Sequence, residues 1–295
     1  MLAARPPASL IYNPHAGRRR HSIALQAISD ALNARYDLRV TPTTQPTEAI
    51  ALAAESARRG DAVAFAWGGD GTVREVVEGL LDSETALGVL PGGTVNVVAL
   101  AIGLSKDPAE AARTLAAAAP QPRDVGLIGP TPFLMQATAG LDAFFMHEVS
   151  VEMKARYGFA GIVLDALRIF PRYRFHAFTV EVDGKPYQVT GAGFVNMAEY
   201  AGPYPFVPGA RWDDGKGHVL LYTGRSHLSA LMFAISLGLG VHHRRRDVQI
   251  LDAESMTIPE QPGLFIQADG DPWRGPLPVT CRLSSTRIKV LIPVP

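Results

Sequence analysis

The residues best suited to chemistry are a glycine-rich segment with one carboxylate, Gly68-Gly69-Asp70-Gly71-Thr72. An apolar stretch that predicts a buried strand, Ala62–Trp67, precedes it, and a helical pattern begins at Val73. Glycines let the backbone turn sharply and bring N–H groups close to a ligand, and a helix N-terminus adds partial positive charge. The segment therefore fits a phosphate-binding turn, and by itself it fits an ordinary tight turn equally well. Asp70 within it indicates a nearby cation or hydroxyl group.

Two further turns also follow directly after a predicted strand. Leu87–Leu90 predicts a strand that enters the turn Pro91–Asn96, and Ser9–Tyr12 predicts a strand that enters Asn13–Gly17. Successive strand–turn–helix units place their turns at the carboxyl edge of one parallel sheet, where α/β proteins bind ligands. Short polar side chains in these turns can contact phosphate or ribose. The sequence has no Walker-type motif, and Asp70 lies in no Gly-x-Gly-x-x-Gly segment.

The elements that position these turns belong to the first of two regions. Strands, turns and helices alternate as far as about Val125, and Pro120-Gln121-Pro122 predicts a boundary. We therefore expect residues 1–122 to form an α/β domain with a parallel sheet. Its predicted helices are residues 23–36, 46–59 and 109–119.

The second region has a different sequence pattern. Short alternating runs predict a β-rich domain over residues 123–295, a β-sandwich with inserted helices, whose extreme C-terminus can return to the first domain. Asp183-Gly184 predicts a hairpin. The predicted strands are residues 131–139, 175–182, 187–196, 217–222, 247–251 and 287–291, and the predicted helices are residues 146–169 and 228–239.

Taken together, these motifs resemble the soluble diacylglycerol kinase catalytic-domain family, which includes bacterial lipid kinases and sphingosine kinases. Their order and spacing match over nearly all 295 residues. The glycine turn at residues 68–72 alone also resembles NAD kinases and phosphofructokinases. The motifs that carry the resemblance are Asn13–Gly17, Gly68–Thr72, Pro91–Asn96, Gly140–Ala143, Lys154 with Tyr157-Gly158, Asp213-Asp214-Gly215 and Asp269-Gly270-Asp271.

The resemblance implies a Mg²⁺-dependent lipid kinase of phospholipid metabolism. Such an enzyme transfers the γ-phosphoryl group of ATP to the hydroxyl of a diacylglycerol-like or sphingoid-like lipid. Asp269 is implied as the general base and Asp70 as a second catalytic residue, while Lys154 is implied to face an anionic phosphate. The implied metal ligands are Asp213, Asp214 and Asp271. The implied nucleotide-binding residues are Asn13, Gly17, Gly68, Gly69, Asp70, Gly71, Thr72, Gly92, Gly93, Thr94 and Asn96.

The chain departs from the family pattern at three positions. His15 replaces the more usual Lys or Ser, Val97 stands where many members have Asp, and Asp271 stands where Glu is usual. The second difference leaves the identity of the lipid open. By themselves, Asp269-Gly270 also fits a plain β-turn and Lys154 a helix surface.

Composition limits the partners and the compartment. The 28 basic and 28 acidic residues cancel, so no overall field attracts nucleic acid. The single cysteine excludes an internal disulfide and fits a reducing compartment, and Met1–Ser9 has no apolar core typical of a secretory signal. Leu228–Val241 is too short to cross a bilayer and predicts a buried or docking helix. The basic run after it, His242–Arg246, predicts either a solvated helix end or contact with anionic lipid.

We accordingly expect a cytoplasmic protein, transiently at the inner membrane surface, that binds a lipid substrate but no nucleic acid and can form a homodimer. Two alternatives remain. One is an NAD kinase or other small-metabolite kinase, against which Asn196 lacks the neighbouring Glu that NAD kinases use. The other is a non-catalytic lipid-binding relic, against which Asp70, Asp269 and both glycine turns are all present.

Overall fold

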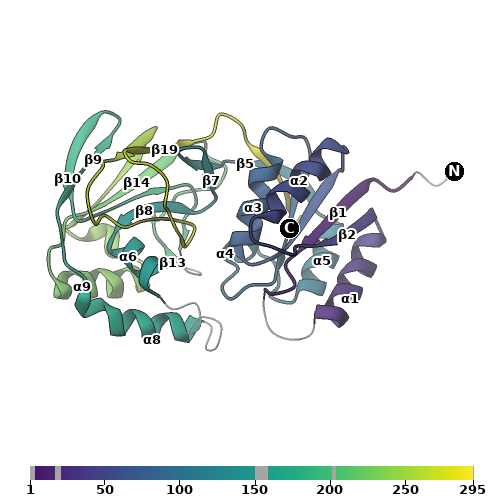
Figure 1. Cartoon of the computed structure of the whole chain (residues 1–295), viewed down its shortest axis with the longest axis horizontal. Helices are drawn as coiled ribbons and strands as arrows, with labels where there is room; N and C mark the ends of the chain where they lie inside the picture. Colours follow the sequence, from purple (N-terminus) through teal and green to yellow (C-terminus); the bar gives the residue numbers. More distant parts are fainter. Residues whose placement is uncertain (1–3, 17–20, 150–158, 201–203, 295) are drawn as a thin grey trace. The chain divides into compact units, whose positions relative to one another are not determined.

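The computed structural model describes residues 4–16, 21–149, 159–200 and 204–294. The chain divides into two units, residues 1–123 with 285–295, and residues 124–284 (Figure 1). It therefore passes from one unit to the other twice. The predicted α/β fold followed by a β-sandwich is confirmed.

One six-stranded sheet organises the first unit, in the order β2-β1-β3-β4-β20-β5. Neighbours among β1 to β4 are parallel, β20 is parallel to β4, and β5 runs antiparallel to β20. The apolar strands β3 and β4 are buried along their whole length. The strands are β1 (Pro7–Tyr12), β2 (Asp37–Pro42), β3 (Val63–Gly68), β4 (Ala86–Pro91), β5 (Ala119–Arg123) and β20 (Ile288–Ile292).

Helices cover this sheet in two groups. Helix α2 packs beside α3, and α1 packs beside α5 (Figure 1). Asp107 caps α5, because its carboxylate accepts hydrogen bonds from the Ala109 and Glu110 amides. The helices are α1 (His21–Asn33), α2 (Glu48–Arg58), α3 (Asp70–Leu80), α4 (Val97–Ala101) and α5 (Pro108–Ala116).

The Pro120-Gln121-Pro122 segment is part of strand β5 rather than a linker. Its partner on one side is β20, and β5 is the last strand of the sheet. An edge strand tolerates proline because half of its amides have no partner in the ladder. The sequence pattern alone does not distinguish such an edge strand from a connecting segment.

Two six-stranded sheets form the second unit. Their orders are β10-β9-β16-β19-β6-β7 and β15-β14-β11-β8-β17-β18. Apolar side chains from both sheets form one core, in which Phe133 and Phe194 meet edge to face. The strands are β6 (Gly126–Ile128), β7 (Thr131–Phe133), β8 (Gln136–Gly140), β9 (Phe178–Val182), β10 (Lys185–Val189), β11 (Gly191–Val195), β14 (Gly217–Tyr222), β15 (Val248–Ala253), β16 (Ser255–Ile258), β17 (Ile266–Ala268), β18 (Asp271–Pro272) and β19 (Val279–Leu283), with a separate pair β12 (Glu199–Tyr200) and β13 (Tyr204–Pro205).

Three sequence predictions for this unit need correction. The expected strand 187–196 is two strands, β10 and β11, which belong to different sheets. The expected strand 131–139 is two strands, β7 and β8, which belong to different sheets. In place of one helix over 146–169, α6 (Leu141–Glu148) ends before α8 (Phe159–Ile169) begins. The hairpin at Asp183-Gly184 is confirmed, since β9 and β10 pair directly across it. The remaining helical elements are α9 (His227–Gly238) and the short 3₁₀ helices η1 (Phe170–Arg172) and η2 (His242–Arg244).

Candidate functional site

Two glycine turns touch each other at the carboxyl edge of the first unit's sheet. They follow the adjacent parallel strands β3 and β4, in which Gly68 is paired with Pro91. The Gly92 amide donates a hydrogen bond of 2.8 Å to the Gly68 carbonyl. A Cβ atom on Gly93 would lie 2.5 Å from the Gly69 Cα. Only glycine permits this approach, so backbone rather than side chains lines the edge.

The N-terminus of α3 opens at this edge. Gly69 has an extended conformation and provides no side-chain cap. The first amides of a helix, here those of Asp70, Gly71 and Thr72, have no acceptor within the helix. The amides of a first helical turn and the helix dipole together favour a phosphate group. The predicted residues 68–72 therefore form a turn with the chemistry of an anion site.

Asp70 connects the first glycine turn to the second. Its carboxylate accepts hydrogen bonds from the amides of Val97 and Val98, both at 3.2 Å, and so caps the neighbouring helix α4. Asn96, which precedes α4, has left-handed backbone angles (φ 56°, ψ 53°). Its Oδ1 accepts from the Gly93 amide at 2.7 Å. Asp70 and Asn96 thus fix the second turn against the first.

The remaining predicted nucleotide residues lie near the same edge or outside the described residues. The Asn13 amide donates to the Trp67 carbonyl at 3.1 Å, which aligns its turn with the end of β3. The Asn13 side chain accepts from the His15 amide at 2.9 Å. Thr94 is exposed in the second turn. Gly17 lies outside the described residues.

In the second unit, Asp269 binds the segment that crosses between the two sheets. Its carboxylate accepts hydrogen bonds from the amides of Leu134 (2.6 Å), Met135 (2.8 Å) and Gln136 (3.2 Å). These residues connect β7 in one sheet to β8 in the other. Asp269 itself has a left-handed backbone with φ 51° and is 9% exposed. Three amide donors stabilise negative charge on this side chain.

A polar network that the sequence interpretation missed lies beside Asp269. The Gly270 amide donates to Gln267 Oε1 at 2.7 Å, and Gln267 Nε2 donates to Asp142 Oδ2 at 2.8 Å. The hydroxyl groups of Thr138 and Tyr200 also donate to the Asp142 carboxylate. Burial and this nearby negative charge raise the pKa of Tyr200 well above its usual value. Asp142 lies in the Gly140–Ala143 motif, for which the sequence alone indicates no role.

The predicted metal ligands do not form one site. Asp213 pairs with the Arg211 guanidinium at 3.1 Å, and Asp214 lies 3.2 Å from His218 Nε2. Asp271 is exposed on β18, four strands away from β14 in the same sheet, or roughly 19 Å. Within the described ranges, no group of three His, Cys, Asp or Glu side chains is arranged to hold a metal ion. These three carboxylates are therefore not gathered at one point, and the chain's own donors bind the two loop carboxylates.

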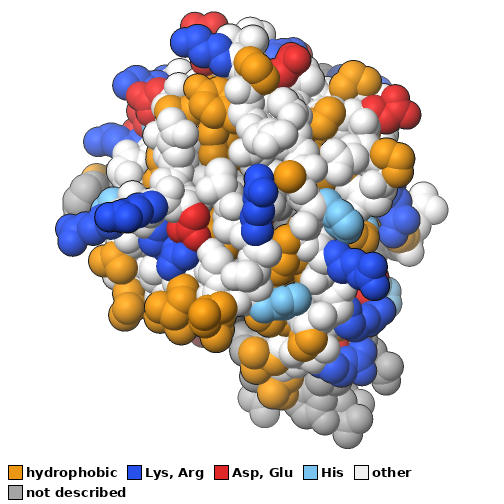
Figure 2. Space-filling model, turned by 90° about the vertical axis from the view of Figure 1, so that its left-hand side faces the viewer, with side chains coloured by type: hydrophobic (Ala, Val, Ile, Leu, Met, Phe, Trp, Pro, Cys, Tyr) orange, Lys and Arg blue, Asp and Glu red, His pale blue; other side chains and the backbone are white. Residues whose placement is uncertain are grey.

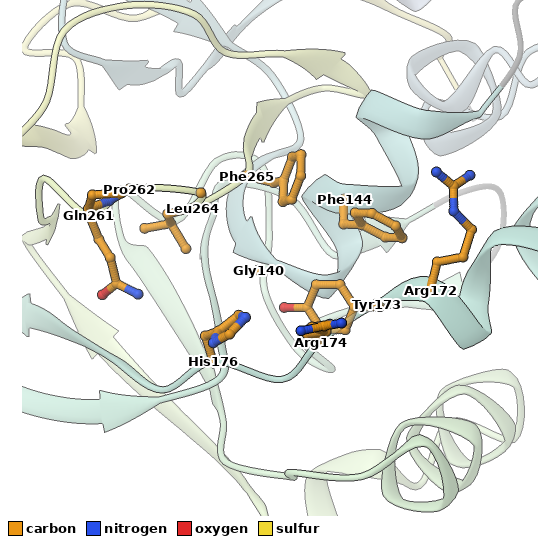
Figure 3. A pocket seen from close by; sticks show the side chains of 11 residues that line it. Gly140, Phe144, Arg172, Tyr173, Arg174, His176, Gln261, Pro262, Leu264 and Phe265 are labelled. Carbon is orange, nitrogen blue, oxygen red and sulfur yellow. The ribbon is translucent and has the colours of Figure 1, made fainter.

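A pocket of about 260 Å³ lies in the second unit (Figure 3). Phe144, Tyr173 and Phe265 converge in it, with ring centroids 5.1 and 5.2 Å from Phe144. Burial raises the pKa of Tyr173 to about 12, with a smaller contribution from Tyr222. Arg172, Arg174 and His176 alternate along one wall. The pocket thus combines aromatic surface with basic groups.

The pocket and Asp269 lie at opposite ends of strand β17. Phe265 immediately precedes this strand, and Asp269 immediately follows it. Four residues of extended chain span roughly 13 Å. A molecule that contacts both would therefore be elongated. Lys154, the predicted phosphate-facing residue, lies outside the described residues.

Asn196 has a structural role. It is fully buried, and its Nδ2 donates to the carbonyls of Asp124 (3.0 Å) and Leu134 (2.8 Å). Both amide hydrogens are used by these bonds. This side chain therefore has no donor left for a nucleoside.

Comparisons with known proteins cover both units. The family model "Diacylglycerol kinase catalytic domain" matches residues 7–128, and "YegS C-terminal NAD kinase beta sandwich-like domain" matches residues 136–292. A Bacillus subtilis (strain 168) protein named "Diacylglycerol kinase" is 34% identical over 185 residues, which are 61% of each chain. A Pseudomonas putida protein named "Probable lipid kinase YegS-like" is 30% identical over 252 residues, covering 83% of this chain and 82% of the relative. A solved structure from Bacillus anthracis superposes with a TM-score of 0.83 at 23% identity, over 99% and 98% of the two chains, and shows the same fold.

Proposed function

Because the chain belongs to the diacylglycerol kinase family of YegS-like lipid kinases, we propose that it transfers the γ-phosphoryl group of ATP to the hydroxyl group of a lipid. The observation that carries this proposal is the pair of abutting glycine turns beside the open N-terminus of α3. Phosphoryl transfer depends mainly on positioning and on charge stabilisation. Backbone amides at this edge supply both for the phosphates of ATP, with the turn after β1 beside them.

The acceptor is a diacylglycerol-like or sphingoid-like lipid. The aromatic pocket and its roughly 13 Å separation from Asp269 support an elongated acceptor rather than a nucleoside. The buried, fully bonded Nδ2 of Asn196 also argues against the NAD kinase alternative. An apolar surface suits acyl chains, whose transfer out of water is favourable by about 25 cal/mol per Å².

Asp269 orients the acceptor hydroxyl and accepts its proton. The hydroxyl oxygen forms a bond to the γ-phosphorus, the bond from that phosphorus to the β–γ bridging oxygen breaks, and ADP leaves. In a loose transition state the proton leaves late, so the carboxylate that three amides hold in place needs only to accept it at the end of the transfer. The Asp142 network fixes the Gly270 turn and therefore the position of Asp269.

Mg²⁺ accompanies ATP in kinases and neutralises charge on its phosphates. We propose that the ion enters with the nucleotide as Mg·ATP. The enzyme works in the cytoplasm and meets its lipid at the inner membrane surface. Among the described residues, no helix is both long and apolar enough to span a bilayer.

Incubation with radiolabelled ATP and a mixed lipid extract tests the proposal directly. We expect label in an extractable lipid, and none after Asp269→Asn. Label in NAD but in no lipid would support the NAD kinase alternative. Binding of lipid without any transfer would support the relic.

A further inference from the structure

Helix α9 presents large apolar side chains to the outside and small ones to the inside. Its buried residues are Ala230 and Ser236, and only Phe233 and Leu237 pack partly against the core. The exposed residues lie at spacings of three and four, within an arc of about 100°. They are Leu228 (69% exposed), Leu231 (46%), Met232 (44%), Ile235 (46%) and Leu239 (71%). We call these five residues the α9 stripe.

Basic residues flank the α9 stripe at both ends. Residues 225–246 contain four arginines and no acidic residue. Arg225 precedes the helix, and Arg244 and Arg246 follow it, all three exposed. Figure 2 shows hydrophobic side chains gathered along the lower edge of this face, with Lys and Arg side chains beside them. An apolar stripe with cationic ends is complementary to an anionic bilayer, which offers acyl chains below a negative surface.

Aromatic contacts connect the start of α9 with the pocket. His227 lies 5.1 Å from Phe170 and 5.2 Å from Phe175 between ring centroids. Phe175 in turn lies 4.9 Å from Tyr173, which lines the pocket. A bilayer in contact with α9 would therefore lie beside the pocket that we assign to the lipid.

We propose that α9 is a membrane-docking helix, which lies in the surface of an anionic bilayer with the α9 stripe among the acyl chains. The helix of 12 residues is about 18 Å long, so it lies along the surface rather than through it. The inference rests on the proposed function only in identifying the bilayer as the source of the acceptor. Docking itself requires neither ATP nor transfer.

Vesicle flotation with Leu231→Gln/Ile235→Gln tests the proposal. The matched control is Ile23→Gln/Val294→Gln, which removes two equally apolar exposed residues from the first unit (72% and 67% exposed). The vesicles are equimolar phosphatidylglycerol and phosphatidylcholine, or phosphatidylcholine alone. We expect the α9 variant to bind the mixed vesicles at least about tenfold more weakly than the parent, and the control to bind like the parent. The parent should prefer the mixed vesicles. A thermal melt checks that both variants are folded.

Other results would overturn the inference. Equal binding by the parent and the α9 variant would exclude the stripe from docking, as would failure of the parent to bind mixed vesicles. Light scattering that shows a dimeric parent and a monomeric α9 variant, with vesicle binding unchanged, would assign the stripe to contact between two copies.

A second assay separates docking from the kinase proposal. Turnover of a short-chain, water-soluble diacylglycerol needs no bilayer, so the α9 variant should match the parent there. If the parent shows no turnover but the vesicle result holds, docking stands and the kinase proposal fails. If turnover is normal and the variant binds vesicles like the parent, the kinase proposal stands and docking fails.

Discussion

At the residue scale, Asp269 and Asp70 have one property in common. Each carboxylate accepts hydrogen bonds from the amides of a segment far away in the sequence. The partners of Asp269 are 133 to 135 residues away, and those of Asp70 are 27 and 28 residues away. Each side chain therefore fixes the position of a turn. This structural role is additional to the role in ATP binding or phosphoryl transfer that we propose for it.

Asp269→Asn should lower kcat by about 10²–10⁴-fold, because the amide cannot accept a proton. ATP affinity should be nearly unchanged, since we assign the nucleotide to the glycine turns of the other unit. The variant also places an NH₂ group against an amide donor, so its free energy of unfolding should fall by about 1–3 kcal/mol. Steady-state kinetics and denaturant titration measure the two effects.

Asp183→Asn is the matched control for Asp269→Asn. Asp183 also has a left-handed backbone and accepts hydrogen bonds from two amides, those of Glu254 and Ser255, in the same unit. The Asp183→Asn variant should have a lower free energy of unfolding than the parent but the same kcat. An Asp269→Asn variant with parental kcat would refute Asp269 as the base.

Asp70→Ala should weaken ATP binding and destabilise the protein together. The loss of the α4 cap should lower the free energy of unfolding by about 1–2 kcal/mol and loosen the second glycine turn. Calorimetric titration with ATP and denaturant unfolding measure this. Asp107→Ala removes the cap of α5 and should destabilise similarly with unchanged ATP affinity. Equal ATP affinity in both variants would remove Asp70 from the nucleotide site.

The glycine turns could be predicted from the sequence because strand, turn and helix follow one another directly. The partners of Asp269 could not, because no local pattern identifies residues 134–136 as amide donors. Asp213 and Asp214 illustrate the same limit. Their carboxylates are bound by Arg211 and His218, side chains that a motif of three residues does not include.

At the element scale, the basic run after α9 divides into exposed and structural residues. Arg245 pairs with Asp247 at 2.7 Å and is half-buried. Desolvation alone would raise the pKa of Asp247, but hydrogen bonds from Arg245 and Ser229 together lower it. Arg244 and Arg246 are exposed on either side. The sequence showed five basic residues in succession but not which of them the fold uses.

Arg244→Gln/Arg246→Gln should weaken binding to anionic vesicles by about 1 kcal/mol per charge, and added salt should reduce the difference. Arg245→Gln should instead lower the free energy of unfolding by about 1 kcal/mol and change vesicle binding little. Flotation at two salt concentrations and denaturant unfolding distinguish the two cases. The assignment fails if Arg245→Gln is the variant that loses vesicle binding.

His242 should make stability depend on pH. Burial lowers the pKa of His242 below 6.5, and the hydrogen bond to the Phe206 carbonyl opposes this only in part. The folded state therefore binds a proton less readily than the unfolded state. Its contribution is fully present above pH 6.5 and is lost as the pH falls through the folded pKa.

His242→Gln should reduce the loss of stability between pH 7 and pH 5, measured by denaturant unfolding at several pH values. The neighbouring His243 is exposed, and its charge is the smallest of the causes that act on the pKa of His242, so His243→Gln should keep most of the pH dependence of the parent. The same pH dependence in the His242 variant as in the parent would show that this buried imidazole is not its source.

At the scale of the whole molecule, strand β20 links the end of the described chain to the first unit. It lies between β4 and β5, and Val290 and Leu291 are almost completely buried. To pair in parallel with β4, the chain must return to the first unit once it has passed through the whole second unit. The sequence predicted the strand from its apolar alternation, but its place within the sheet depends on pairing between distant segments.

A chain that ends at Ser284 should lose the first unit's fold and with it ATP binding. Removing a strand from within the sheet exposes the buried edges of β4 and β5. Proteolysis and ATP titration measure the effect. Removal of residues 293–295 alone, beyond β20, should leave both properties unchanged. Full ATP affinity in the shorter chain would show that β20 is dispensable.

The position of β20 also determines when the first unit can complete its sheet during translation. Domains generally fold as units, the N-terminal one first, as the chain emerges from the ribosome. Here the strands up to β5 emerge early, but the sheet stays incomplete until residues 288–292 have been synthesised. The nascent chain therefore cannot complete the sheet that carries both glycine turns before the entire second unit has been made. A chain whose synthesis stops within the second unit should accordingly lack the ATP binding that we propose for the first.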